Sequence, residues 1–164
     1  MAGAAQAQSF AASGTTNVAL HVPAEAALSI GAATTNLNTS DTIFGAPFVG
    51  TTNFTYMIRT GSATTGNISL KVTTDFPTGG PQIASLPSGD ALTYTCTATS
   101  SSGSACGSAQ TASTSSTTPV VGFGAQAHSA KAGDAGSVSW SMTNDPVYAV
   151  GDWTATVTFT ISAT

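Results

Sequence analysis

Few side chains in this sequence are of the types that carry out chemistry. Cys96 and Cys106 are separated by nine residues in the stretch YTCTATSSSGSACGSAQ, and no histidine or third cysteine lies near them. That pattern favours a disulfide closing a Ser/Gly-rich loop over a metal site, with two buried free thiols as the alternative. A disulfide would indicate an oxidising compartment and would stabilise the fold by about 3 kcal/mol.

The remaining titratable residues show no catalytic or metal-binding spacing. His21 and His128 have no carboxylate or cysteine at a ligand-like distance in the sequence, so we expect both at the surface. Asn144, Asp145 and Asp152 are the one conceivable calcium cluster, and they lack the spacing of known calcium loops. No nucleophile elbow, zinc-protease motif, phosphate loop or dinucleotide fingerprint occurs. The sequence therefore predicts no catalytic residue, no metal, no cofactor and no enzyme.

Charge excludes several kinds of partner. Only 6% of the 164 residues are charged, against about 25% in typical soluble domains, and the net charge is −4. The fixed cations are Arg59, Lys71 and Lys131, too few to neutralise a nucleic acid or an anionic membrane. No apolar run reaches the length of a membrane-spanning helix, so we expect no membrane insertion. The length suits one domain.

Apolar residues recur at every second position, which is the period of a β-strand. The inward sets are Val18, Leu20, Val22; Leu28, Ile30; Phe54, Tyr56, Ile58; Ile68, Leu70, Val72; Leu92, Tyr94, Cys96; Val121, Phe123; Val138, Trp140, Met142; and Trp153, Ala155, Val157, Phe159, Ile161. About eight such strands predict an all-β, antiparallel, Ig-like or pilin-like sandwich over residues 15–164. The runs 54–58 and 68–72, joined by a turn-like stretch, predict a hairpin.

Two segments do not fit the strand pattern. Residues 1–14 include Ala5, Gln6 and Ala7, a small-x-small sequence of the kind that precedes signal-peptidase cleavage, so we expect a signal-peptide remnant or a flexible leader and a secreted protein. Residues 100–118 are almost wholly Ser, Thr, Gly and Ala, which predicts a surface loop.

Both ends of the domain carry a family likeness. The closing stretch GDWTATVTFTISA is a strand with alternating threonines after a Gly-acidic-aromatic lead, and it follows an early NVALHVPAEAALSIG. These stretches, the short disulfide and the strand layout resemble the secreted spore coat protein U-like family and the fimbrial subunits of the chaperone-usher type. The resemblance implies a bacterial cell-surface pilus or fibre, of use in adhesion or biofilm, whose subunits polymerise by strand donation.

In strand donation, an incomplete sandwich receives an extended segment from another copy, which supplies ladder hydrogen bonds and apolar plugs. The expected donor is residues 15–22, with Pro23 and Ala24 as the hinge, and the expected acceptor is the edge beside the last strand. The interface residues would be Val18, Leu20 and Val22 on the donor, and Val157, Phe159 and Ile161 on the acceptor. The partners would then be copies of the same chain.

Two alternatives remain at this stage. Residues 15–22 would complete their own sandwich in a monomer, or the protein would be a secreted recognition module that binds host or surface glycans through its loops. Most aromatic residues fall on inward positions, and Tyr148, in a predicted turn, is the ring best suited to a sugar.

Overall fold

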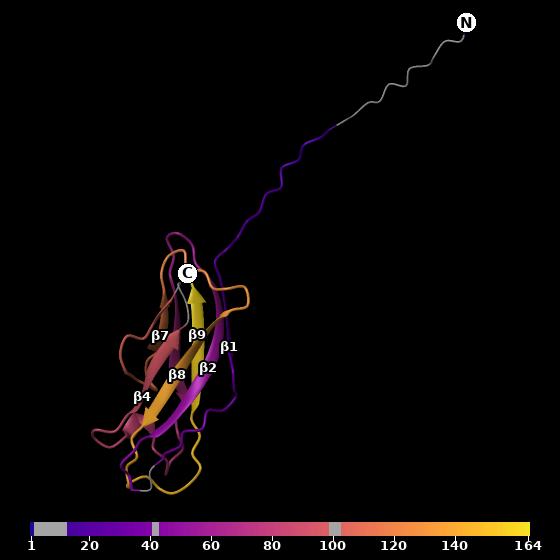
Figure 1. Ribbon diagram of the computed structural model, residues 1–164. Coiled ribbons are helices and arrows are strands. Elements are labelled where there is room, and N and C mark those ends of the chain that lie inside the picture. The colour runs from indigo at the N-terminus through magenta and orange to yellow at the C-terminus, as the bar shows by residue number, and fades with distance from the viewer. Residues whose placement is uncertain (2–12, 41–42, 99–102) are drawn as a thin grey trace.

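The computed structural model describes residues 1, 13–40, 43–98 and 103–164 and confirms an all-β sandwich of two antiparallel sheets (Figure 1). The strands are β1 (Glu25–Ile30), β2 (Phe48–Arg59), β3 (Gly66–Thr74), β4 (Leu92–Ala98), β5 (Gly103–Ala105), β6 (Gln110–Thr111), β7 (Thr118–Phe123), β8 (Asp134–Met142) and β9 (Thr156–Ala163). A single 3-10 turn, η1 (Ile83–Ser85), is the only helical element in the described ranges.

The strand order places the chain's first and last strands together at one side of the sandwich. One sheet has the order β1-β2-β8-β4-β6, and the other has the order β5-β7-β3-β9. The edge strands β1 and β9 contact each other across the two layers, and at the opposite side β4 contacts β5. The sandwich therefore has two seams, one between β1 and β9 and one between β4 and β5.

The predicted core is largely correct. The inward residues of β2, β3, β4, β7 and β8 are nearly inaccessible, and they are Phe54, Tyr56, Ile58, Ile68, Leu70, Val72, Leu92, Tyr94, Val120, Val121, Phe123, Val138, Trp140 and Met142. The indole N–H of Trp140 donates to Thr52 Oγ1 at 2.9 Å, so this buried donor has a partner. The core thus forms from alternate residues of both sheets, as expected for a sandwich.

The predicted hairpin is wrong. β2 pairs with β1 and β8, whereas β3 pairs with β7 and β9 in the other sheet. The connection after β2 is tied to the segment that follows β7, because Thr60 Oγ1 donates to the Gly124 carbonyl at 2.8 Å and the Ala127 N–H donates to Thr60 Oγ1 at 2.7 Å. These bonds turn the chain from one sheet into the other.

The last strand is shorter than its alternation predicts. β9 begins at Thr156, and Trp153 lies before it with its ring against Gly80 and Gly151. A Cβ at Gly80 would come within 2.8 Å of that ring, so the indole occupies the space that a side chain would need. The Trp153 Nε1–H also donates to the Ala149 carbonyl at 3.0 Å.

Short strands also occur inside the segment expected as a loop. β5 pairs with β7, and β6 pairs with β4, while Ser113 accepts the N–H groups of Ser115 and Ser116 in an exposed turn. Residues 99–102 lie outside the described residues. With β5 and β6 added, and residues 17–22 outside any strand, the described part of the chain forms nine strands instead of about eight.

Candidate functional site

The first candidate feature is an N-terminal arm, residues 13–24, which is extended and runs away from the sandwich (Figure 1). Its apolar residues are exposed: Val18 by 91%, Leu20 by 84% and Val22 by 53%. The structure therefore does not bring the predicted donor segment onto its own sandwich. Exposed alternate apolar residues on an extended chain are costly in water and are suited to a sheet partner.

One side chain fixes the point where the arm leaves the sandwich. Arg59, the last residue of β2, donates from Nε to the Pro23 carbonyl at 2.7 Å and from Nη2 to Glu25 Oε2 at 2.9 Å. The Arg59 and Glu25 side chains are 39% and 74% exposed, so the ion pair itself contributes little stability. The effect of Arg59 is geometric, because its hydrogen bond to the Pro23 carbonyl ties the predicted hinge to the body of the domain.

The second candidate feature is the free edge of β9. Among the described residues, no segment pairs with the side of β9 that faces away from β3. The inward residues Val157, Phe159 and Ile161 are only partly buried, in contrast to the inward residues of β3, which are at most 2% exposed. The seam between β1 and β9 is therefore incompletely covered.

The backbone of β9 shows which groups are available at that edge. The Thr164 N–H donates to the Thr65 carbonyl at 2.9 Å, and the register continues from Ala163 opposite Gly66. Because backbone groups in an antiparallel strand point alternately to either side, the even-numbered residues of β9 bond to β3. The N–H and C=O groups of Val157, Phe159, Ile161 and Ala163 consequently face the free edge.

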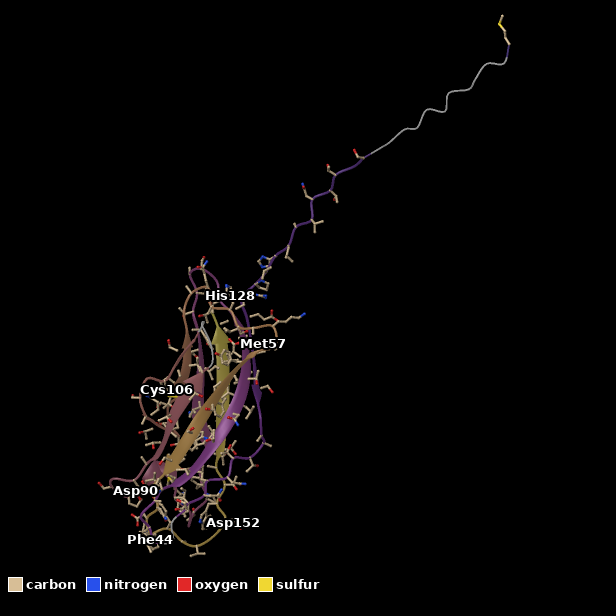
Figure 2. The ribbon with its side chains drawn as sticks, in the orientation of Figure 1. Phe44, Met57, Asp90, Cys106, His128 and Asp152 are labelled. Atoms are coloured by element: carbon tan, nitrogen blue, oxygen red, sulfur yellow. A yellow bond between two sulfur atoms is a disulfide. The ribbon has the colours of Figure 1, made fainter. Side chains whose placement is uncertain are left out.

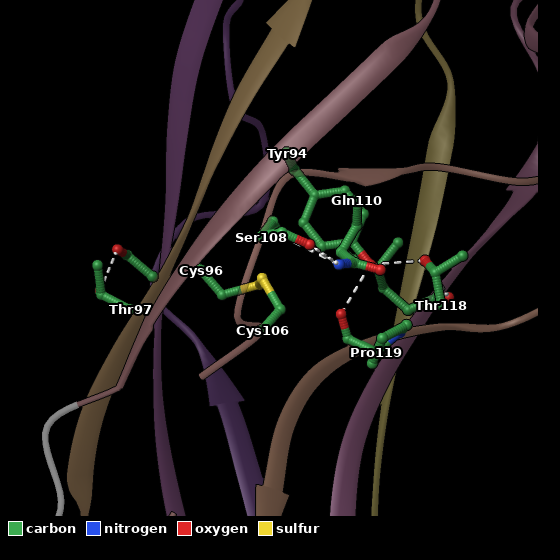
Figure 3. Close-up of a disulfide and its surroundings, with 10 residues drawn as sticks. Tyr94, Cys96, Thr97, Cys106, Ser108, Gln110, Thr118 and Pro119 are labelled. Atoms are coloured by element: carbon green, nitrogen blue, oxygen red, sulfur yellow. Dashed lines mark hydrogen bonds between the residues drawn. A yellow bond between two sulfur atoms is a disulfide. The ribbon is translucent and has the colours of Figure 1, made fainter. Parts of the chain in front are cut away.

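The opposite seam is closed by a covalent bond. Cys96 in β4 and Cys106, next to β5, form the predicted disulfide, with their Cα atoms 5.4 Å apart (Figure 3). Beside it, the Tyr94 hydroxyl lies 2.7 Å from Thr118 Oγ1 and 2.9 Å from the Pro119 carbonyl. The alternative of two free thiols is excluded. A disulfide thus joins the two sheets at the β4–β5 side, whereas at the β1–β9 side the described strands are in contact without a covalent link.

Within the single chain, the structure does not bring the predicted donor residues into contact with the predicted acceptor residues. The donor residues lie on a free arm, and the acceptor residues line an edge without a strand partner. Sequence reasoning missed Arg59 as the anchor of the arm, since its partners are 34 and 36 residues away along the chain. It also missed Ala26 and Leu28, the partly buried inward residues of β1 at the same seam.

The titratable residues serve local structure. Asp75 accepts N–H groups from Phe76, Ile83 and Ala84 at 2.8 to 2.9 Å. His21 and His128 are exposed. Across residues 13–40, 43–98 and 103–164, no three His, Cys, Asp or Glu side chains come together as metal ligands.

Tyr148 is not a free ring. Its hydroxyl donates to Asp90 Oδ2 at 2.5 Å, and its side chain lines a hollow of about 170 Å³ with residues 79–82 and 85–87. Burial raises the pKa of the Tyr148 hydroxyl above its ordinary value of 10.0, and the hydrogen bond to Asp90 and the charges of Asp90 and Asp145 raise it further. The phenol is therefore engaged in a hydrogen bond that joins its loop to the loop of Asp90.

Comparisons of the chain with protein-family models, with curated proteins and with solved structures find no match. None of the helical structure in the described part of the chain is long and apolar enough to cross a membrane. The disulfide is typical of proteins that fold in an oxidising compartment.

Proposed function

We propose that this protein is a non-enzymatic structural subunit of an extracellular filament or pilus, which polymerises by strand donation between copies. The observation that carries the proposal is the presence, in one chain, of two features. One is an extended arm with three exposed alternate apolar residues, and the other is the edge strand β9, whose outer side has no strand partner among the described residues and whose three inward residues are only partly buried. The arm is an alternating apolar segment without a sheet partner, and β9 is a strand with one free side, so each can pair with the other. Secretion and a place at the cell surface are part of the same proposal, supported by the disulfide.

An antiparallel register is the arrangement that matches both features. If Leu20 of one copy lies opposite Phe159 of the next, Val22 falls opposite Val157 and Val18 falls opposite Ile161. Residues directly opposite each other in a ladder point to the same face, so all three arm residues would point into the sandwich. The arm would also meet the N–H and C=O groups that face outward along β9.

The β9 edge lacks the usual protection against such pairing. Exposed edges are commonly blocked by proline, lysine or inward charges, and the sequence TVTFTISA of β9 contains none of these. Threonine side chains fill the solvent face, where Thr158 Oγ1 lies 2.9 Å from Thr73 Oγ1. These contacts brace β9 against β3 and leave its outer edge open.

The energies suggest that pairing is favourable without being very strong. Burying two valines and one leucine contributes roughly 1.5–3 kcal/mol each. Association costs an estimated 4–15 kcal/mol in lost freedom of motion. Burial of Val18, Leu20 and Val22 therefore roughly offsets the cost of association. The net affinity would come from the ladder hydrogen bonds and from any contact between the two sandwiches.

Deletion of residues 1–22 tests the proposal. The variant keeps Pro23, which contacts Arg59, and none of the described residues that it loses packs in the core. We expect the full chain to form filaments in negative-stain electron microscopy and the variant to remain as single particles with unchanged thermal stability. Filaments that persist in the variant would contradict donation by the arm.

A further inference from the structure

We propose that successive subunits also touch end to end, with the loop of residues 147–152 of one copy seated in a hollow beside Arg59 of the copy that donates the arm. This inference rests on the proposed function, since it concerns copies already joined by the arm. The arm pole comprises residues 59–65 and 124–133, and the loop pole comprises residues 75–91 and 143–155.

The two poles lie at opposite ends of the sandwich. Figure 2 places Met57 and His128 towards the end where the arm leaves, and Asp90 and Asp152 at the other end. β9 runs from the loop pole at Thr156 to the arm pole, where Thr164 pairs with Thr65. An arm lying antiparallel to β9 therefore enters the acceptor with Val22 nearest the acceptor's loop pole.

The hinge is too short to keep the two bodies apart. Three residue steps separate Val22 from Glu25, the first residue of β1, and they span at most about 11 Å when fully extended. Arg59 holds the Pro23 carbonyl, which shortens the free part of the hinge further. The acceptor's loop pole must then rest against the donor's arm pole.

The arm pole offers a receptive surface. A hollow of about 290 Å³ lies beside the start of the arm, between the ends of β1 and β2 and the segment 128–131. Its walls include apolar groups from Ala27 and Met57, and basic groups from Arg59, His128 and Lys131. Glu25 also lines the hollow and is paired with Arg59, so Lys131 is the cation left for a partner. Two of the three fixed cations of the chain thus meet at this site, and Lys131 forms no ion pair among the described residues.

The loop pole offers matching chemistry. Residues 75–91 and 143–155 contain four aspartates and no Lys, Arg or His. Asp75 and Asp145 accept N–H groups of their own loops, and Asp90 accepts the Tyr148 hydroxyl of the neighbouring loop. Asp152 is exposed. Near it in the chain, Val147 and Val150 are 67% and 105% exposed. An acidic loop with exposed valines fits a basic hollow with an exposed methionine.

Charge exchange in the full chain tests this contact. We expect Lys131→Glu and Asp152→Lys each to raise the critical concentration for assembly about 2- to 5-fold, the range for one exposed ion pair. The double variant should return to within about 2-fold of the wild type. Lys71→Glu, which reverses a lysine on β3, is the matched control and should have a smaller effect. Equal effects of all three single changes would overturn the contact.

A second measurement uses the unaltered protein. Carbodiimide cross-linking of wild-type filaments, followed by mass spectrometry, should join Lys131 to Asp152 between copies and should not join Lys71 to Asp152. Filaments without the first link and without sensitivity to the charge changes would overturn the pole contact alone. Wild-type protein that forms only closed dimers, or never assembles, would overturn the proposed function as well.

Discussion

Leu20→Ala is the substitution that isolates the arm's role most cleanly. Leu20 is 84% exposed, so its truncation removes almost no packing from the single subunit. In a donated strand it would lie opposite Phe159, and the change would remove three buried carbon groups at about 0.8 kcal/mol each. The loss of about 2.4 kcal/mol corresponds to a fall of roughly 50-fold in the association constant.

Critical concentrations from sedimentation or light scattering, beside thermal unfolding of the unassembled subunit, measure this effect. His21→Ala is the matched control, because His21 is the exposed neighbour of Leu20 and alternates to the other side of the arm. We expect its critical concentration to stay within about 2-fold of the wild type. An unchanged critical concentration in Leu20→Ala, or a lower melting temperature of its monomer, would refute the reasoning.

Three further predictions concern the sandwich itself. Replacing Cys96 and Cys106 by alanine should lower the free energy of unfolding by about 3 kcal/mol, measured by urea denaturation, and an unchanged midpoint would contradict the stabilising role of the disulfide. Thr52→Val should cost about 1–3 kcal/mol in the same assay, because the buried Trp140 N–H loses its acceptor; Thr51→Val, at an exposed position, should cost much less. Burial raises the pKa of the Tyr94 hydroxyl in the folded protein above 10.0. The contribution of the protonated hydroxyl to the free energy of unfolding is therefore complete below pH 10 and is lost as the pH rises beyond it. Stability should therefore fall above pH 10, and less steeply in Tyr94→Phe; parallel curves would contradict this assignment.

The sequence was sufficient for the fold class and most of the core because alternation reports which face of a strand is buried. It could not give strand pairing, because alternation is the same whichever neighbour a strand has. Phe54–Ile58 and Ile68–Val72 thus read as a hairpin, although β2 and β3 lie in different sheets. The start of β9 could not be predicted either, since Trp153 continues the alternation. Its ring fits where Gly80, far away in the sequence, leaves room for it.

The disulfide was predictable from two cysteines without other ligands nearby, and the donor and acceptor residues were named from pattern and resemblance. Their exposure could not be predicted, because a strand that completes its own sandwich has the same alternation as one that leaves it. Neither could the anchor at Arg59, whose hydrogen bond to a backbone carbonyl depends on tertiary structure. The short strands β5 and β6 escaped notice because Ser, Thr and Gly carry little apolar signal.

Amide hydrogen exchange at β9 tests the central claim most directly. The measurement compares the variant lacking residues 1–22 with and without a synthetic peptide of residues 13–24, using residue-resolved NMR. The amides of Val157, Phe159 and Ile161 should exchange rapidly without the peptide and become protected when it binds, while Thr158 and Thr160 stay protected throughout. Peptide binding that leaves the three amides unprotected, or protection already present without peptide, would contradict donation of the arm to the β9 edge.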